Sequence, residues 1–149
     1  MLINPSFKIE KEIKAKLRRY RKVASVWALE LTESVEVETL EGKELAGVGD
    51  YLCRGIANEL WPQSKTKLLA NYDPSGVFDK DAWQRFDPKA NTESVLAAQL
   101  DFPFQVASPR GELNGKPGDF VVVNSSDMAD VWIVDQQIFA ATYETFFAN

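Results

Sequence analysis

The sequence contains no histidine and a single cysteine, and these two scarcities exclude much chemistry. Without histidine, Ser-His-Asp and Cys-His catalysis and histidine-ligated metal sites are excluded, and the usual general base near neutral pH is missing. Because Cys53 stands alone, an intrachain disulfide and a cysteine-based zinc site are excluded too. Carboxylate, lysine and tyrosine chemistry remains possible, but the sequence favours a non-catalytic protein over an enzyme. We expect no metal and no cofactor.

Long apolar runs are also missing. No segment approaches the roughly 18 to 20 apolar residues that a membrane-spanning helix needs, so we expect no membrane association. Residues 1–5 lead straight into charged residues without the apolar stretch of a secretory signal, so a cytoplasmic location is expected. Phosphate-binding glycine loops are absent, because the glycines stand at isolated turns. The hydrophobic content of 45% is ample for a buried core.

Positive charge is scarce outside one segment. The net charge is -5, yet residues 8–22 contain eight basic and two acidic residues, which makes the remaining chain strongly acidic. Within this segment Ile9, Ile13, Leu17 and Tyr20 recur at helical spacing, which predicts an amphipathic helix from Pro5 to Arg21. We expect its apolar stripe to pack on the body, on a second subunit or on a protein partner. Nucleic-acid binding through the basic face is the alternative, and the acidic body disfavours it.

A short motif occurs twice, because Gly49-Asp50-Tyr51 is repeated as Gly118-Asp119-Phe120. Residues 25–31 match residues 94–100, and the two matches keep the same distance to the motif. Aromatic residues recur eleven positions apart behind both copies: Trp61 and Tyr72 in the first, Trp132 and Tyr143 in the second. So many coincidences in the same order indicate an internal duplication.

Short strands are predicted in each copy by apolar residues that alternate with polar ones, beginning at 25–31, 35–39 and 51–54. Ser64 is a candidate N-cap for one turn of helix, and Asp79 for a short linker helix over 80–86. We therefore expect a mostly β (α+β) protein with two tandem small β-barrel-like or curled-sheet repeats. The expected divisions are a basic helix at 1–22, repeats at 23–72 and 91–149, and a linker at 73–90, with both repeats packed as one compact domain.

Both copies resemble a small uncharacterised family of phage, prophage and bacterial proteins named for its PGDYG motif. The residues that carry the resemblance are 20–22, 39–42, 49–51, 117–120 and 138–144. The resemblance covers most of 20–72 and 91–144, and it implies a link to phage or mobile-element biology without an activity or a substrate. The chain departs from the pattern where Phe120 replaces tyrosine and 108–111 replace Thr-Leu-Glu-Gly.

Asp50 and Asp119 are the candidate catalytic residues, because two close carboxylates can share a proton and act as acid and base. The competing interpretation is that each aspartate binds local backbone N–H groups at its turn, and the sequence favours it. A function that needs the Tyr51 hydroxyl could survive in one copy at most.

The candidate ligand-binding residues are aromatic or basic. Trp61, Trp132, Tyr72 and Tyr143 could stack on a base, sugar or peptide, although their recurrence favours a core role. Arg54 could meet an anion, although a surface ion pair is favoured. Trp27 and Trp83 have no aromatic counterpart in the other copy, which makes them better candidates for an interface. The function that the sequence favours is a non-catalytic binding module, and a small carboxylate-dependent enzyme is the alternative.

Overall fold

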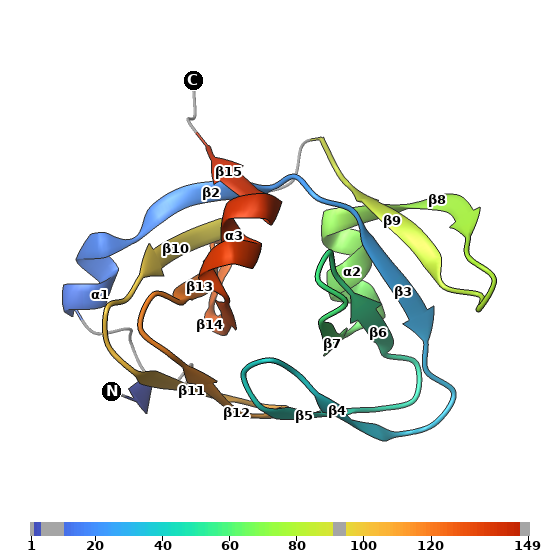
Figure 1. The fold of residues 1–149 in the computed structure, drawn as a ribbon, viewed down its shortest axis with the longest axis horizontal. Helices are drawn as coiled ribbons and strands as arrows, with labels where there is room; N and C mark the ends of the chain where they lie inside the picture. Colours follow the sequence, from blue (N-terminus) through green and yellow to red (C-terminus); the bar gives the residue numbers. More distant parts are fainter. Residues whose placement is uncertain (1, 4–10, 91–94, 147–149) are drawn as a thin grey trace. The chain divides into compact units, whose positions relative to one another are not determined.

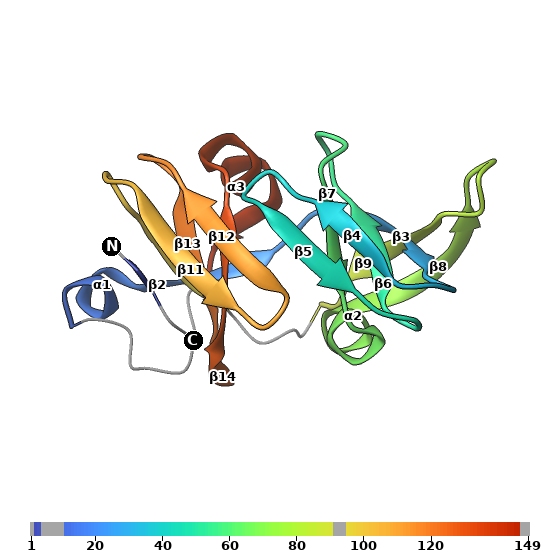
Figure 2. The ribbon, with the colours of Figure 1, turned by 90° about the horizontal axis from the view of Figure 1, so that it is seen from below.

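The structure is a computed structural model that describes residues 2–3, 11–90 and 95–146. The chain is mostly β and divides into two compact units. Unit 1 combines Met1–Lys22 with Glu93–Asn149, and unit 2 is Val23–Thr92. The ribbon is shown in Figures 1 and 2.

Unit 1 is built on a five-stranded antiparallel sheet with the order β14-β13-β10-β2-β15. Its strands are β2 (Arg18–Lys22), β10 (Val95–Gln99), β13 (Phe120–Asn124), β14 (Asp127–Val134) and β15 (Tyr143–Thr145). A separate sheet joins β1 (Leu2–Ile3), β11 (Phe104–Ser108) and β12 (Gly111–Gly115). The helices are α1 (Lys11–Lys16) and α3 (Gln136–Thr142).

Alternation along β13 explains how both faces of this sheet are buried. Val121 and Val123 belong to a core with Ile13 of α1 and with the apolar side chains of β11 and β12. Val122 points to the other face and packs with Phe139 of α3. The sheet therefore lies between the β11–β12 hairpin with α1 on one side and α3 on the other, and Figure 1 shows α3 beside the strands. A strand buried on both faces must be apolar at successive positions, which is the pattern of β13.

Unit 2 has a five-stranded antiparallel sheet with the order β7-β6-β3-β9-β8. Its strands are β3 (Val26–Glu30), β6 (Tyr51–Arg54), β7 (Leu60–Gln63), β8 (Tyr72–Phe78) and β9 (Gln84–Pro88). A second sheet contains β4 (Val35–Glu38) and β5 (Lys43–Ala46). Helix α2 (Lys65–Asn71) begins after Ser64, whose hydroxyl accepts the N–H of Lys67 as an N-cap. The core joins Leu68 of α2 to buried side chains of the sheet.

The strand orders of the two units correspond position for position, and so do the turns that start β6 and β13. The N–H of Leu31 bonds the carbonyl of Asp50, and the N–H of Leu100 bonds that of Asp119. Both motif glycines adopt positive φ, +88° at Gly49 and +97° at the equivalent Gly118, a conformation that glycine adopts without a steric cost. The strand expected at 51–54 and the helix expected after Ser64 are confirmed.

The amphipathic helix expected from Pro5 to Arg21 is wrong over its last residues. Helix α1 ends at Lys16, and Arg18–Lys22 form β2, which pairs with β10 and β15. The backbone of β2 completes a sheet that would otherwise have a gap, and this tertiary pairing overrides local helical spacing. The expected start, Pro5 to Glu10, lies outside the described residues. Residues 1–22 belong to unit 1 together with 93–149 rather than forming a separate division.

The linker helix expected over 80–86 is also wrong. Residues 73–90 lie within unit 2, where β8 and β9 form a hairpin. Asp79 accepts the N–H groups of Asp81 and Trp83, so it caps a tight turn and not a helix. Within the described residues the sheets are open, and none closes into a barrel.

The pairing of β2 makes unit 1 discontinuous, which gives a folding prediction. A fragment of residues 23–92 keeps all five strands of its sheet, whereas a fragment of residues 91–149 lacks the strand between β10 and β15. We expect 23–92 to show a cooperative thermal transition, and 91–149 to show one only after a peptide of residues 1–22 is added. Circular dichroism of the fragments, alone and mixed, measures this. Cooperative unfolding of 91–149 alone, unchanged by the peptide, would contradict it.

Candidate functional site

An arginine lies between two tryptophan rings on one face of the unit 2 sheet. Trp27 of β3 and Arg54 of β6 are direct partners in the strand register, so their side chains share a face. The Arg54 guanidinium carbon is 5.7 Å from the centre of the Trp27 ring and 4.8 Å from that of Trp83. We call Trp27, Arg54, Asp79 and Trp83 the tryptophan–arginine cluster.

Asp79 fixes the position of Arg54 within this cluster. Arg54 Nη2 is 3.1 Å from Asp79 Oδ2, and the other carboxylate oxygen of Asp79 accepts the N–H groups of Asp81 and Trp83 at 2.8 and 3.1 Å. Burial raises the pKa of Asp79, but the hydrogen bonds from Arg54 and these two N–H groups outweigh burial and leave the pKa below its usual value. The carboxylate therefore stays ionised and holds both the guanidinium and the turn.

The cluster is preformed and partly open to solvent. The side chains of Arg54 and Asp79 are 26% and 24% exposed, and both tryptophans are half-buried. Flat aromatic faces beside a guanidinium suit an apolar or aromatic group that carries a carboxylate or a carbonyl. In unit 1 the register pair equivalent to Trp27 and Arg54 is Leu96 and Val123, and both contribute to a buried core. The cluster is therefore a property of unit 2.

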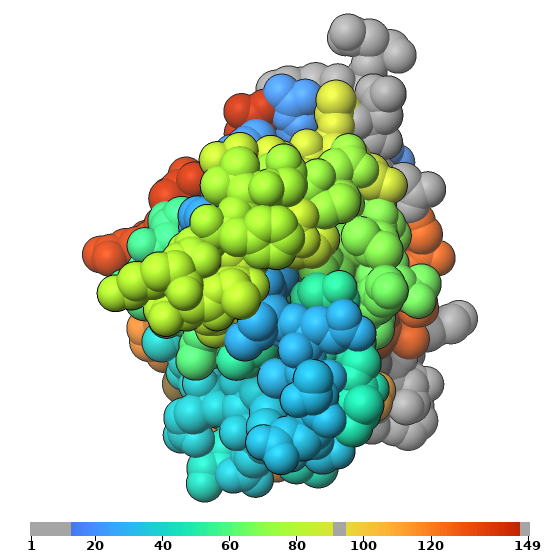
Figure 3. All heavy atoms as spheres, turned by 90° about the vertical axis from the view of Figure 1, so that its right-hand side faces the viewer, coloured from blue at the N-terminus to red at the C-terminus, as the bar shows by residue number. Residues whose placement is uncertain are grey.

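Exposed apolar side chains gather in the same unit. Of the nine large hydrophobic side chains that are exposed among the described residues, only Met128 lies in unit 1. The eight in unit 2 are Val23, Leu40, Leu45, Val48, Ile56, Leu69, Val77 and Phe78. Val77 and Phe78 belong to the β8–β9 hairpin, which also carries Asp79 and which stands out beside the β3–β4 segment in Figure 3.

The predicted carboxylates lie at the two Gly-Asp turns, one in each unit. Asp50 Oδ2 accepts the N–H of Gly47 at 2.8 Å, and Asp119 Oδ2 accepts the N–H of Lys116 at 3.0 Å. Asp119 is 2% exposed, and its second oxygen is 2.8 Å from Lys116 Nζ. Each carboxylate therefore serves the turn of its own unit, as the structural interpretation of the motif expects.

The four recurring aromatic residues line the cores. Tyr72 is 5% exposed and Trp61 packs against the same cluster of buried residues, while Trp132 and Tyr143 pack against Phe139 in unit 1. The Tyr143 ring stacks on Phe139 with ring centres 4.5 Å apart, and burial raises the pKa of its hydroxyl. These positions suit side chains that fix the interior better than side chains that meet a ligand.

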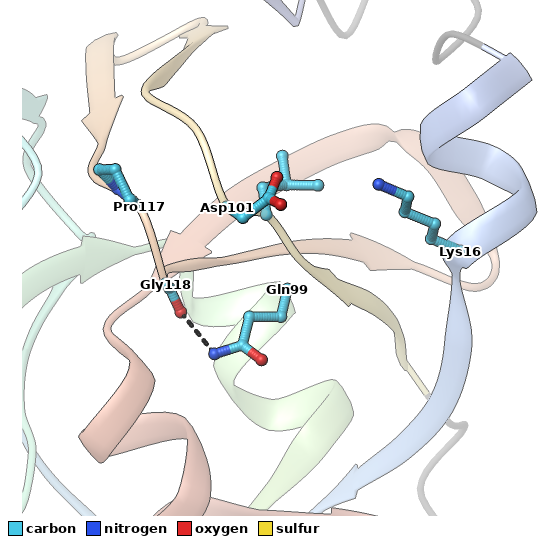
Figure 4. A pocket seen from close by; sticks show the side chains of 6 residues that line it. Lys16, Gln99, Asp101, Pro117 and Gly118 are labelled. Atoms are coloured by element: carbon cyan, nitrogen blue, oxygen red, sulfur yellow. Dashed lines mark hydrogen bonds between the residues drawn. The ribbon is translucent and has the colours of Figure 1, made fainter.

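A shallow hollow of about 460 Å³ lies beside the second motif turn in unit 1. Its lining includes Lys16, Gln99, Asp101 and Gly118, and the Gln99 amide donates to the Gly118 carbonyl at 3.1 Å (Figure 4). Lys16 and Asp101 are both exposed at its rim. The hollow brings no group of converging buried polar side chains together, so the tryptophan–arginine cluster is the stronger candidate site.

Other features of the described residues bear on the site chemistry. No group of three or more His, Cys, Asp or Glu side chains among them is placed to hold a metal ion. Their helices include none that is long and apolar enough to cross a membrane. No family model, no curated protein and no solved structure matches this chain.

Sequence reasoning singled out every aromatic and basic member of the cluster but did not join them. Arg54 was predicted to form a surface ion pair, and the pair with Asp79 confirms this. Trp27 and Trp83 were singled out as residues without a counterpart. One sequence signal could have placed Trp83 near Arg54. Residues 79–83, which begin with Asp79, fit a tight turn capped by the aspartate side chain as well as they fit the start of a helix.

A substitution at Arg54 tests the rigidity of the cluster. Arg54→Lys keeps a positive charge near Asp79 but loses the planar contact with both rings. We expect altered near-ultraviolet circular dichroism and tryptophan fluorescence, with a loss of stability of about 1 kcal/mol. Arg85→Lys, at the register partner of Trp27 on the other side, is the matched control and should change both signals less. Equal changes in the two variants would contradict a specific stacking role.

Lys116 gives a pH prediction for unit 1, because it bridges Asp119 and Asp135. The hydrogen bond from Lys116 lowers the pKa of Asp135 against the opposing effect of burial. A carboxyl whose pKa is lower in the folded state stabilises above its ordinary pKa of about 3.9, and this stabilisation is lost as the pH falls through the folded value. We expect unfolding free energy to fall below about pH 4, and to fall less in Lys116→Met. Chemical denaturation from pH 6 to 2 measures this, and identical pH profiles would contradict it.

Proposed function

We propose that this protein is a non-catalytic binding module whose unit 2 carries the ligand surface. One observation carries the proposal: unit 2 sets a partly exposed Arg54 between Trp27 and Trp83, whereas unit 1 has an aliphatic pair, partly buried Leu96 and buried Val123, in the corresponding register. Tryptophan and arginine are the residues that dominate binding energy at protein interfaces. The concentration of exposed apolar side chains in unit 2 supports the same assignment.

The ligand class that fits this surface is a peptide segment. Two flat rings provide apolar contact area at a low cost in side-chain entropy, and the guanidinium can bind a peptide carbonyl or carboxylate. The anchoring of Arg54 by Asp79 reduces the ordering that binding has to impose. The acidic balance of the chain outside 8–22 disfavours a nucleic acid as the ligand.

Four expectations from the sequence are kept as parts of this proposal: the tandem duplication, the link to phage biology, the cytoplasmic setting and association through the N-terminal segment. The matched strand orders and matched turns of the two units support an origin by tandem duplication, with the second copy retained as a packed scaffold and the first as the binding unit. We further propose a role in phage or prophage biology, supported by the resemblance of residues 20–72 and 91–144 to the PGDYG-motif family, and a cytoplasmic setting, supported by the missing secretory signal. Association through the N-terminal segment is a weaker hypothesis, because Ile13 is 2% exposed and contributes to the core of unit 1.

The carboxylate-dependent enzyme is the weaker alternative. Asp50 and Asp119 both bind turn N–H groups, and Asp119 is also paired with Lys116. A carboxylate engaged by the backbone of its own turn suits a structural role better than proton transfer.

Selection of a displayed library of short peptides against the intact protein tests the binding function. The selected peptide is titrated while the indole N–H signals of the four tryptophans are followed by NMR. We expect shifts at Trp27 and Trp83, with Trp61 and Trp132 serving as internal controls because they pack against the cores. Failure to select any peptide, or shifts confined to the controls, would contradict the proposal.

A matched pair of variants measures how much Trp83 contributes to the affinity for the selected peptide. Trp83→Ala should weaken binding of the selected peptide by about thirtyfold, as expected for a central interface residue. Met128→Ala removes an exposed apolar side chain of unit 1 and should leave the affinity unchanged. Circular dichroism of both variants shows whether a loss of binding follows from a loss of folding.

A further inference from the structure

The β4–β5 hairpin of unit 2 has a strand edge that its counterpart in unit 1 does not leave open. In unit 1, β11 pairs with β12 on one side and with β1 on the other, where Leu2 and Ile3 lie parallel to Gln105 and Val106. In unit 2, β4 pairs with β5 alone within the described residues. Figure 2 shows β4 and β5 as a two-stranded ribbon.

The backbone groups at this edge can be identified from the hairpin turn. Thr39 and Gly42 exchange two backbone hydrogen bonds, at 2.9 and 3.4 Å. Hydrogen-bonded and non-hydrogen-bonded pairs alternate along an antiparallel ladder, so Val37 opposite Glu44 is also a hydrogen-bonded pair. Glu36 and Glu38 are then non-hydrogen-bonded residues with respect to β5. Their N–H and C=O groups point toward the outer edge of β4.

The side chains at this edge define a partner. Val37 is 4% exposed and faces the interior of unit 2, whereas Glu36 and Glu38 are exposed on the opposite face. A strand added along β4 would place alternate side chains beside the two glutamates and the others beside the valines. Glutamates dominate the hairpin charge: Glu33, Glu36, Glu38, Glu41 and Glu44 lie within residues 33–44, against Lys43 alone. Charge complementarity therefore selects lysine or arginine at every second position of the added strand.

We propose that unit 2 binds an extended partner segment, in which basic residues alternate with apolar ones, as a strand added in parallel along β4. Main-chain hydrogen bonds to Glu36 and Glu38 supply the affinity, and the glutamate side chains supply the selectivity. The same glutamates reject acidic strands and a second copy of β4 itself, which protects an open edge from self-association. This surface is separate from the tryptophan–arginine cluster, so the inference goes beyond the proposed function.

A segment of a second copy is a poorer occupant than a partner of this composition. The extended residues of this chain that pair with a hairpin, Leu2 and Ile3, are already engaged with β11 in unit 1. A second copy would have to give up that pairing before it could add a strand to β4, so the exchange would form no net hydrogen bonds.

The test uses the full-length protein and a capped peptide of alternating lysine and valine as the probe. We expect slower hydrogen exchange at the Glu36 and Glu38 amides, by about tenfold at a peptide concentration well above its Kd. The Gln105 amide should not change, because β1 already pairs with β11 at that point. The indole signals of Trp27 and Trp83 should not shift, which separates this outcome from that of the proposed function.

Two N-methylated forms of the probe distinguish strand addition from charge attraction. In a parallel pair, the lysine opposite Glu36 directs its own N–H away from β4, and the neighbouring valines direct theirs toward it. N-methylation of the valines should therefore abolish binding, whereas N-methylation of the lysines should leave the affinity within about twofold. Equal affinity of the two forms would overturn the proposal.

Substitutions on the protein test the charge selection. Glu36→Gln/Glu38→Gln should weaken the lysine–valine probe by about tenfold at low salt, since two exposed ion pairs are lost, and the difference should shrink as salt screens them. Asp101→Asn/Glu112→Gln removes the same number of exposed charges from unit 1 and should bind like the unmodified protein. Binding that follows net charge alone, with equal losses in both double variants, would overturn the assignment to this edge.

Discussion

The insertion of β2 between β10 and β15 is the pairing on which unit 1 depends. Arg18–Lys22 come from the start of the chain, yet their backbone closes the sheet of residues that follow 93. In unit 2 the same place is taken by β9, which belongs to the continuous segment 23–92. Tyr20 also enters the aromatic group around Phe139, at 4.8 Å between ring centres. Without β2, β15 would lose its only ladder partner and β10 would lose the ladder bonds on one edge, so unit 1 requires residues from both ends of the chain.

Local sequence signals predicted the elements whose stability is local. The strand at Tyr51–Arg54 and the helix capped by Ser64 follow from alternation and from capping chemistry, and both are present. The wrong expectations fall where a segment pairs with a distant strand. Residues 18–22 have helical spacing but lie in a sheet, and residues 84–86 were expected in a helix but pair with β3 and β8. Neither partner can be read from the segment itself, because its position is set by the fold.

The candidate site was predictable in its parts but not in its assembly. Comparison of the two copies singled out Trp27, Arg54 and Trp83, since each lacks its counterpart. Their meeting depends on the cross-strand register of β3 with β6 and on the turn that Asp79 caps, and both are tertiary facts. By contrast, the recurring motif at Asp50 and Asp119 suggested a functional site and turned out to stabilise turns. The residues that recur in both units are those that each unit needs in order to fold. The residues that differ lie where one unit can change without loss of its fold.

This difference explains why the two units present such unequal surfaces. Unit 1 receives β1 and α1 from the N-terminal segment, one on its hairpin edge and one on its sheet. Unit 2 has no preceding segment of its own, because that segment belongs to unit 1. Within the described residues, β4 of unit 2 accordingly pairs with β5 alone. Burial of apolar surface is the main favourable term in folding, so a unit that lacks two covering elements keeps apolar groups in solvent. The exposed side chains of unit 2 therefore follow from the assignment of the N-terminal segment to unit 1, and they motivate the proposal that unit 2 carries the binding surface.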